Sequence, residues 1–167
     1  SNLRRGVLMK YQRILVPFDG SDHAEGAFTT ARELALQSET AEIFVVNIVP
    51  MALASSLTAG TDPITGGSSA FIDQEGYTAM VDTALENIKK EIDEVVDPLL
   101  DGMPAERVHT EVVTYPSAVS GITEYASNHD CDLIVMGRRG LGGIRGVLGS
   151  VSYGVLRAVD IPVLTVK

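Results

Sequence analysis

Five short runs of apolar, β-forming residues are spread along this chain of 167 residues. Each is separated from the next by a longer segment. Several runs are nearly continuous in apolar residues, which is typical of strands that are buried on both faces of a parallel sheet. The runs cover residues 13–18, 42–49, 107–115, 132–136 and 161–166.

The segments between the runs carry helical signals. From residue 78 to 96, apolar residues recur at spacings of three and four, which predicts an amphipathic helix. Shorter helices are expected after Ser21, after Ser117 and over residues 150–159. For the first of these, Asp22 has the capping-box spacing to Glu25, and Ser21 is an equal candidate for the N-cap. Strands that alternate with crossover helices predict an α/β fold, a mostly parallel sheet with helices on both faces.

The length favours a single domain, which we place at residues 11–167. Residues 1–10 are expected to be an N-terminal extension or a cloning remnant, with Met9 as an alternative start. Residues 50–76 are rich in Ser, Thr, Gly and Ala and predict a flexible insertion without regular structure. Loops of this length in small domains are usually functional lids or disordered.

The composition argues against several classes of partner. A net charge of −9 and a pI near 4.7 disfavour binding to nucleic acid or to anionic membranes. No apolar stretch is long enough to span a bilayer, and no signal peptide is visible, so a cytoplasmic location is expected. The single cysteine, Cys131, adjoins a predicted strand and is expected to be a small buried hydrophobic residue.

A glycine-rich segment, VMGRRGLGGIRGVLGS at residues 135–150, follows the fourth predicted strand and leads into a helix. Glycine lets backbone N–H groups approach a ligand closely, and a helix N-terminus attracts anions. Arg138, Arg139 and Arg145 add local positive charge, most simply as solvated groups near a phosphate. The segment therefore predicts a phosphate site, the alternative being a flexible connection in which Ser150 is only an N-cap.

Two common phosphate-binding motifs are absent from this segment. It lacks G-x-x-x-x-G-K-[ST], and Arg145 stands where G-x-G-x-x-G requires glycine. A P-loop NTPase or an ordinary dinucleotide enzyme is therefore disfavoured. The three histidines, His23, His109 and His129, lie in different predicted elements and lack metal-ligand spacing.

Taken together, the motifs resemble the universal stress protein family of the ATP-binding type. The likeness rests on ILVPFDGS near the start, DLIVMGRRGLGG and LGSVS in the glycine-rich region, and PVLTVK at the end. It implies a Rossmann-like, open five-stranded parallel sheet of order 3-2-1-4-5. The family motif G-x2-G-x9-G-[ST] is matched except that eight residues, rather than nine, separate Gly140 from Gly149.

The resemblance also implies which residues bind the nucleotide. Asp19 is similar to the family acid near the ribose and a phosphate-bound metal, while Pro17 shapes its turn. The backbone at Ile48 would read the adenine edge. A turn-capping role for Asp19 and a purely structural role for Ile48 are the alternatives. The remaining implied contacts to ribose and phosphates come from Met136, Gly137, Arg139, Gly140, Gly149, Ser150 and Val151.

The expected function is that of an ATP-binding stress-response regulator in which nucleotide occupancy acts as a conformational signal. AMP or ADP are alternative ligands, with Mg²⁺ or Mn²⁺ on the phosphates. A slow ATPase or autokinase, and a nucleotide-free dimeric scaffold of the same fold, are the alternative functions. No general base is identifiable from the sequence, so no catalytic residue is assigned. The resemblance further implies a homodimer formed through the C-terminal edge strand.

Overall fold

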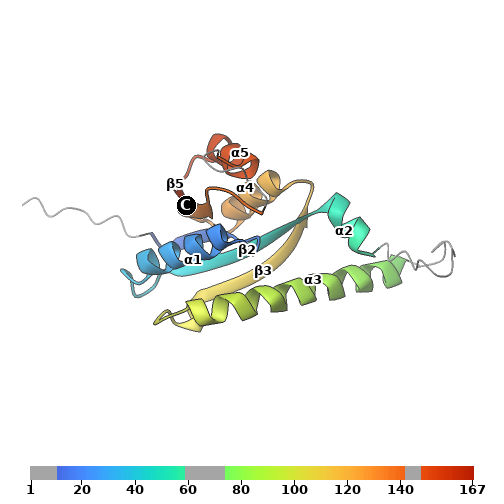
Figure 1. Cartoon of the computed structure of the whole chain (residues 1–167), viewed down its shortest axis with the longest axis horizontal. Coiled ribbons are helices and arrows are strands. Elements are labelled where there is room, and N and C mark those ends of the chain that lie inside the picture. Colours follow the sequence, from blue (N-terminus) through green and yellow to red (C-terminus); the bar gives the residue numbers. More distant parts are fainter. Residues whose placement is uncertain (1–10, 59–73, 142–147) are drawn as a thin grey trace, which may run out of the picture.

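The computed structural model describes residues 11–58, 74–141 and 148–167. Five strands and five α-helices follow one another along the described chain (Figure 1). The strands are β1 (Arg13–Pro17), β2 (Glu42–Pro50), β3 (Val108–Tyr115), β4 (Leu133–Gly137) and β5 (Val163–Val166). The α-helices are α1 (Asp22–Ala35), α2 (Met51–Thr58), α3 (Gln74–Val96), α4 (Ala118–Asn128) and α5 (Ser150–Ala158). Two short 3-10 helices, Asp97–Leu99 and Ala105–Arg107, connect α3 to β3.

The strands form one parallel sheet in the order β3-β2-β1-β4-β5, which confirms the predicted fold class. The central strand β1 pairs with β2 on one side and with β4 on the other, with Ile14 opposite both Ile43 and Leu133. The chain order therefore reverses on either side of β1. In open α/β sheets a ligand crevice forms at this position, beyond the carboxyl ends of the strands.

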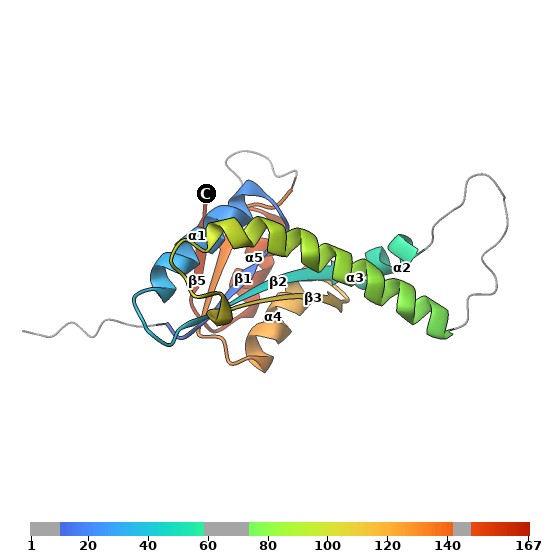
Figure 2. The same ribbon diagram turned by 90° about the horizontal axis from the view of Figure 1, so that it is seen from below.

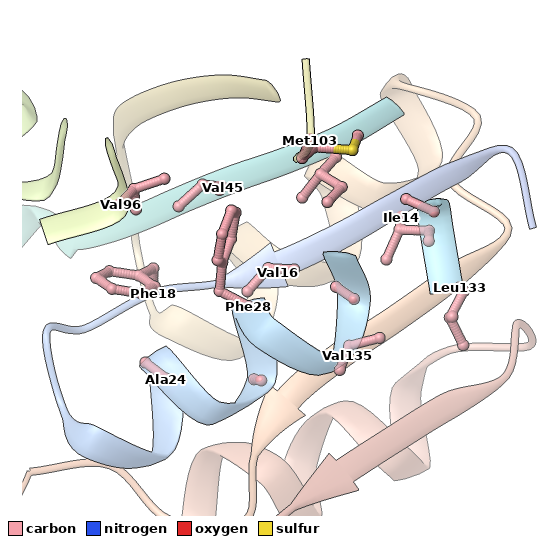
Figure 3. Close-up of a cluster of buried hydrophobic side chains, with 14 of the residues drawn as sticks. Ile14, Val16, Phe18, Ala24, Phe28, Val45, Val96, Met103, Leu133 and Val135 are labelled. Atoms are coloured by element: carbon pink, nitrogen blue, oxygen red, sulfur yellow. The ribbon is translucent and has the colours of Figure 1, made fainter. Parts of the chain in front are cut away.

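Two hydrophobic clusters cover the two faces of the sheet, because successive strand residues point to opposite faces. On one face, Ile14 and Val16 of β1 pack with Phe28 of α1 and Val96 of α3 (Figure 3). On the other face, buried residues of the same strands pack against Tyr125 of α4 and Val155 of α5. Figure 2 shows α1 and α3 together over the first face. The prediction of helices on both faces is thus confirmed.

Helix starts follow local capping chemistry. Ser21, rather than Asp22, is the N-cap of α1, and its hydroxyl oxygen accepts from the N–H of Ala24 at 3.2 Å. At α4, Ser117 and Ser120 form a reciprocal capping box. Each cap satisfies N–H groups that have no partner inside the helix. The turn that carries Ser21 and the start of α4 both border the site described below.

The expectation that residues 50–76 lack regular structure is wrong at both ends. Pro50 closes β2, the helix α2 follows at once, and α3 begins at Gln74 instead of residue 78. The reason for α2 is local composition: Met51, Ala52, Leu53 and Ala54 are good helix formers, which the average over the whole stretch concealed. Residues 59–73 and 1–10 lie outside the described residues, so the predicted flexibility and the N-terminal extension stay predictions.

Within the part of the chain that the structure describes, no helix has both the length and the apolar character needed to cross a bilayer.

Candidate functional site

A cavity of about 470 Å³ opens at the carboxyl ends of β1, β2 and β4. Its walls come from the turn between β1 and α1, the end of β2, the start of α4 and the segment that joins β4 to α5. The crevice expected from the strand order is therefore present. Its size suits a small organic ligand, since such sites usually span about 300–1,000 Å³.

Every residue that the sequence assigned to nucleotide binding lines this one cavity. The predicted residues are Pro17, Asp19, Ile48, Met136, Gly137, Arg139, Gly140, Gly149, Ser150 and Val151. The structure adds residues that the sequence analysis missed, among them Phe18, Ser21, Val46, Asn47, Ala118, Ile122, Leu141 and Ser152. Most of these are immediate neighbours of predicted residues. The two from α4, Ala118 and Ile122, carry no sequence signal because only the chain crossover brings α4 to the cavity.

The start of α5 faces the cavity with exposed backbone donors. Its N-cap is Gly149, which is extended (φ −63°, ψ 153°) and makes no side-chain cap. The alternative in which Ser150 is only an N-cap is therefore wrong, because Ser150 is the first helical residue and is exposed. The N–H groups of a first helical turn have no intrahelical acceptor and carry the positive end of the helix dipole. This end of the cavity is built to receive an anion.

Hydrogen bonds from Ser152 and Gly149 hold the start of the glycine-rich segment against the start of α5. The hydroxyl of Ser152 donates to the carbonyl oxygen of Gly137 at 2.9 Å. The carbonyl oxygen of Arg138, at 3.2 Å, is a second acceptor for the same hydroxyl. The N–H of Gly149 donates to the carbonyl oxygen of Arg138 at 2.9 Å. Since Ser152 is buried, these bonds are shielded from water and fix the two ends of the segment relative to each other.

Arg139 supplies a charged donor in the cavity wall. Its Nε is buried and has no hydrogen-bond partner among the described residues. A buried donor without an acceptor costs about 1–3 kcal/mol, so such groups usually await a ligand or water. Because the Nε has almost no exposed surface, an anion in the cavity would bind it only after the guanidinium group moves. Arg138, by contrast, does not line the cavity, and Arg145 lies outside the described residues.

The end of the cavity near β2 is mainly apolar. Val46 and Ile48 of β2, Ile122 of α4 and Met136 of β4 contribute aliphatic or thioether side chains. This is the kind of surface that packs against the face of a planar heterocycle. The carboxyl end of β2 leaves backbone N–H and C=O groups near the same surface, which could pair with the edge of such a ring.

The turn after β1 is fastened to β2 by two hydrogen bonds. The N–H of Phe18 donates to the carbonyl oxygen of Val46 at 2.9 Å, and the side-chain amide of Asn47 donates to the carbonyl oxygen of Phe18 at 2.7 Å. Both polar groups of the Phe18 backbone are thereby held by β2. This fixes the position of the next residue, Asp19.

The Asp19 carboxylate accepts three hydrogen bonds within the protein. Oδ1 accepts from the N–H of Ser21 at 3.0 Å and from its hydroxyl at 2.6 Å. Oδ2 accepts from the N–H of Leu141 at 3.2 Å. The carboxylate thus connects the turn before α1 to the glycine-rich segment at Leu141, and both line the cavity. The capping alternative for Asp19 is realised, together with a long-range contact that no sequence pattern indicated.

Neither the histidines nor the cysteine is among the residues that line the cavity, although His23 adjoins one of them. His23 lies beside Gly137, where an added Cβ would be 2.8 Å from the His23 Cβ. His109 contacts Glu42 at 2.7 Å, and His129 stacks on Tyr125 with a 3.7 Å centroid distance. No group of three or more potential metal ligands occurs among the described residues. Cys131 is buried, and burial raises the pKa of its thiol to about 11.

Comparison with known proteins identifies the family. The model of the universal stress protein family matches residues 10–167. The chain belongs to the universal stress protein family. Among curated members of this universal stress protein family, MJ0531 of Methanocaldococcus jannaschii is 31% identical over 163 residues, which cover 94% of this chain and 82% of that protein. Sll1388 of Synechocystis is 31% identical over 161 residues, which cover 95% of this chain and 99% of that protein.

Solved structures share the universal stress protein fold with this chain. The protein MJ0577 superposes with a TM-score of 0.71 at 22% identity, covering 95% of this chain and 96% of that one. A universal stress protein solved in complex with cAMP has a TM-score of 0.60 at 23% identity, and the match covers 95% of this chain and 98% of that one. A universal stress protein from Archaeoglobus fulgidus in complex with dAMP has a TM-score of 0.55 at 22% identity, and the match covers 95% of this chain and 100% of that one.

Proposed function

We propose that this protein binds an adenine nucleotide in the cavity and acts as a regulatory stress-response protein, with ATP as the expected ligand and ADP or AMP as alternatives. The observation that carries the proposal is the pairing of two anion-directed features in one cavity wall. One is the start of α5 at Gly149, which has no side-chain cap, and the other is the Arg139 side chain in the cavity wall, whose Nε has no hydrogen-bond partner among the described residues. Binding of cAMP and dAMP by two proteins of the same fold supports an adenine nucleotide over other phosphate esters.

The nucleotide would lie along the cavity from β2 to α5. The base would pack among Val46, Ile48, Ile122 and Met136, with the backbone at Ile48 pairing with the adenine edge. The phosphates would accept hydrogen bonds from the first N–H groups of α5 and from Arg139. Occupancy would change the environment of the glycine-rich segment, which gives a bound and a free state that a partner can distinguish.

The expected Mg²⁺ or Mn²⁺ does not fit the chain as the structure has it. Asp19 is the one carboxylate among the described residues that line the cavity, and its oxygens already accept from Ser21 and Leu141. Three of the four lone-pair positions of the carboxylate are used, so a metal would have one position left on Oδ2 unless it displaced a donor. Divalent ions in nucleotide sites usually take one or two protein carboxylates in addition to the phosphates. We therefore assign no step of binding to a metal.

Nothing in the described part of the cavity favours the slow ATPase or autokinase. Its titratable side chains there are Asp19 and Arg139. Hydrolysis needs a group that orients or deprotonates the attacking water, and a carboxylate engaged by three donors is a poor candidate. A phosphate-release assay decides the matter. We expect no turnover above background, and turnover that the Asp19→Ala variant abolishes would contradict a purely binding role.

We also propose a homodimer through β5 and a cytoplasmic location. β5 is an edge strand of the sheet, and its Leu164 is 40% exposed. Edge strands offer unpaired backbone groups to a second chain. Light scattering tests this: Leu164→Glu should shift a dimer toward monomer, while Leu36→Glu, at a similarly exposed leucine of the α1 C-cap, should not. A monomeric wild type at micromolar concentration would contradict the dimer.

Calorimetry tests the proposed function directly. The protein is stripped of bound nucleotide and titrated with ATP, ADP, AMP and adenosine, and with GTP as the base control. Arg139→Met should weaken ATP binding about tenfold or more, because a charge-assisted hydrogen bond is lost, and should leave adenosine binding unchanged. Arg157→Met, at an exposed arginine in the last turn of α5, is the matched control. Absence of heat with every adenine nucleotide at millimolar concentration would refute the function.

A further inference from the structure

We infer that Asp19 is a positioning residue whose carboxylate fastens residues 137–141, the described first part of the glycine-rich segment, to the start of α1, and that it is not a metal ligand. The inference rests on the proposed function, because the segment it holds carries the phosphate-binding groups of the same cavity. It assigns a different role to the acid that the sequence placed near a phosphate-bound metal.

The two carboxylate oxygens of Asp19 accept hydrogen bonds from different parts of the chain. Oδ1 is used at the start of α1, where it accepts from the N–H and the hydroxyl of Ser21. Oδ2 accepts from the N–H of Leu141, a residue 122 positions later in the chain. Leu141 directly follows Arg139 and Gly140, so the contact fixes the backbone next to the cavity arginine. A carboxylate can make such a connection because it is an acceptor on both oxygens.

The Asp19 carboxylate lies directly against Gly140. A Cβ built on Gly140 would lie 2.5 Å from Oδ2 of Asp19. A side chain at this position would have to push the Asp19 carboxylate away, whereas the backbone of Gly140 does not have a positive φ that would itself favour glycine.

The charge of Asp19 makes the direction of the change in ATP affinity informative. A negative charge beside a phosphate site opposes anion binding, so its removal should tighten ATP binding if the charge acted alone. A fastening role predicts the reverse: without the carboxylate, the segment that carries Arg139 is no longer held, and ATP binding weakens. A metal-ligand role predicts weakening only when a divalent ion is present. The three roles therefore give three different outcomes.

The first experiment examines the contact in nucleotide-free protein by NMR. In the wild type, the amide proton of Leu141 should lie downfield because it donates to a carboxylate. Asp19→Ala should move it upfield, whereas Ser150→Ala, a cavity variant outside the contact, should not. A Leu141 amide signal that is unchanged in Asp19→Ala would overturn the inference. Because no nucleotide is present, this result is independent of the proposed function.

The second experiment titrates wild type and Asp19→Asn with ATP and adenosine, in EDTA and in Mg²⁺. Asparagine has nearly the same shape, but it has one acceptor oxygen in place of two, so it cannot accept from both Ser21 and Leu141. We expect ATP affinity to fall about tenfold in both buffers, since a hydrogen bond to a charged group is lost, while adenosine affinity stays the same. Weakening confined to Mg²⁺, tighter binding in EDTA, or unchanged ATP affinity would each overturn the inference. A wild type that binds no adenine nucleotide would instead refute the proposed function.

A double-mutant cycle with Gly140 separates the contact from any direct role of Gly140 in phosphate binding. Gly140→Ala should weaken ATP binding in the wild-type background, because its Cβ pushes Oδ2 away. In the Asp19→Ala background the same substitution should have little further effect. Equal losses in the two backgrounds would show that Gly140 acts independently of Asp19 and would contradict the proposed fastening.

Discussion

Replacing Ser150 by proline removes one backbone N–H from the start of α5 without disturbing the helix. Ser150 is the first helical residue, where proline is well tolerated, because the N–H there has no intrahelical acceptor. The preceding Gly149, at φ −63° and ψ 153°, already has the extended conformation that a residue before proline prefers. The free energy of unfolding should therefore change by no more than about 0.5 kcal/mol.

The effect on nucleotide binding should be much larger. If this N–H donates to a phosphate, its loss removes a hydrogen bond to a charged group, worth about 1.5–3 kcal/mol, or roughly 10- to 150-fold in affinity. Ser150→Ala is the matched control, because it removes the hydroxyl and keeps the N–H. Calorimetry with ATP and urea denaturation should be run on both variants. Equal ATP affinities for Ser150→Pro and Ser150→Ala, with both variants folded, would refute the reasoning that backbone donors of α5 hold the phosphates.

Three further predictions concern the body of the fold. Phe28→Ala, at a side chain with no exposed surface between α1 and the sheet, should lower the free energy of unfolding by about 3–5 kcal/mol in urea titrations; a loss below about 1 kcal/mol would contradict its place in the core. The Cys131 thiol should react with a thiol reagent at pH 8 only after unfolding, since burial raises its pKa to about 11; fast labelling of the native protein would contradict this. Between pH 9 and 11 the unfolded chain loses the Cys131 proton first, so stability should fall as the pH rises, and chemical denaturation should show a shallower fall for Cys131→Ala; parallel curves would contradict it.

The sheet could be predicted because its signals are local and strong. The buried strands β1, β2 and β4 are nearly continuous in apolar residues, and their predicted bounds differ from the structure by only a residue at either end. The helix α2 was missed for the opposite reason. Its eight residues, MALASSLT, are short and adjoin a turn-rich stretch, so an average over residues 50–76 hid them.

The site could be predicted in its membership but not in its contacts. Glycine spacing, strand ends and the resemblance to the universal stress protein family indicated which residues gather at the cavity, and the parallel topology brings them together. The bond from Leu141 to Asp19 depends on the relative placement of two loops, and no spacing rule encodes that distance. The unpartnered Nε of Arg139 depends likewise on packing around the guanidinium group, which a sequence does not display.

The helix α3 spans 23 residues, yet the residues recorded as buried in it, Ile92 and Val96, lie in its last two turns. Its opposite end, with Tyr77 and Met80 each 41% exposed, extends beyond the sheet beside α2 (Figures 1 and 2). Tertiary packing supplies most of the stability of a protein helix. Unravelling of α3 should therefore start at Gln74 and require progressively more free energy toward Val96, so that native-state amide exchange slows along the helix while the sheet remains intact.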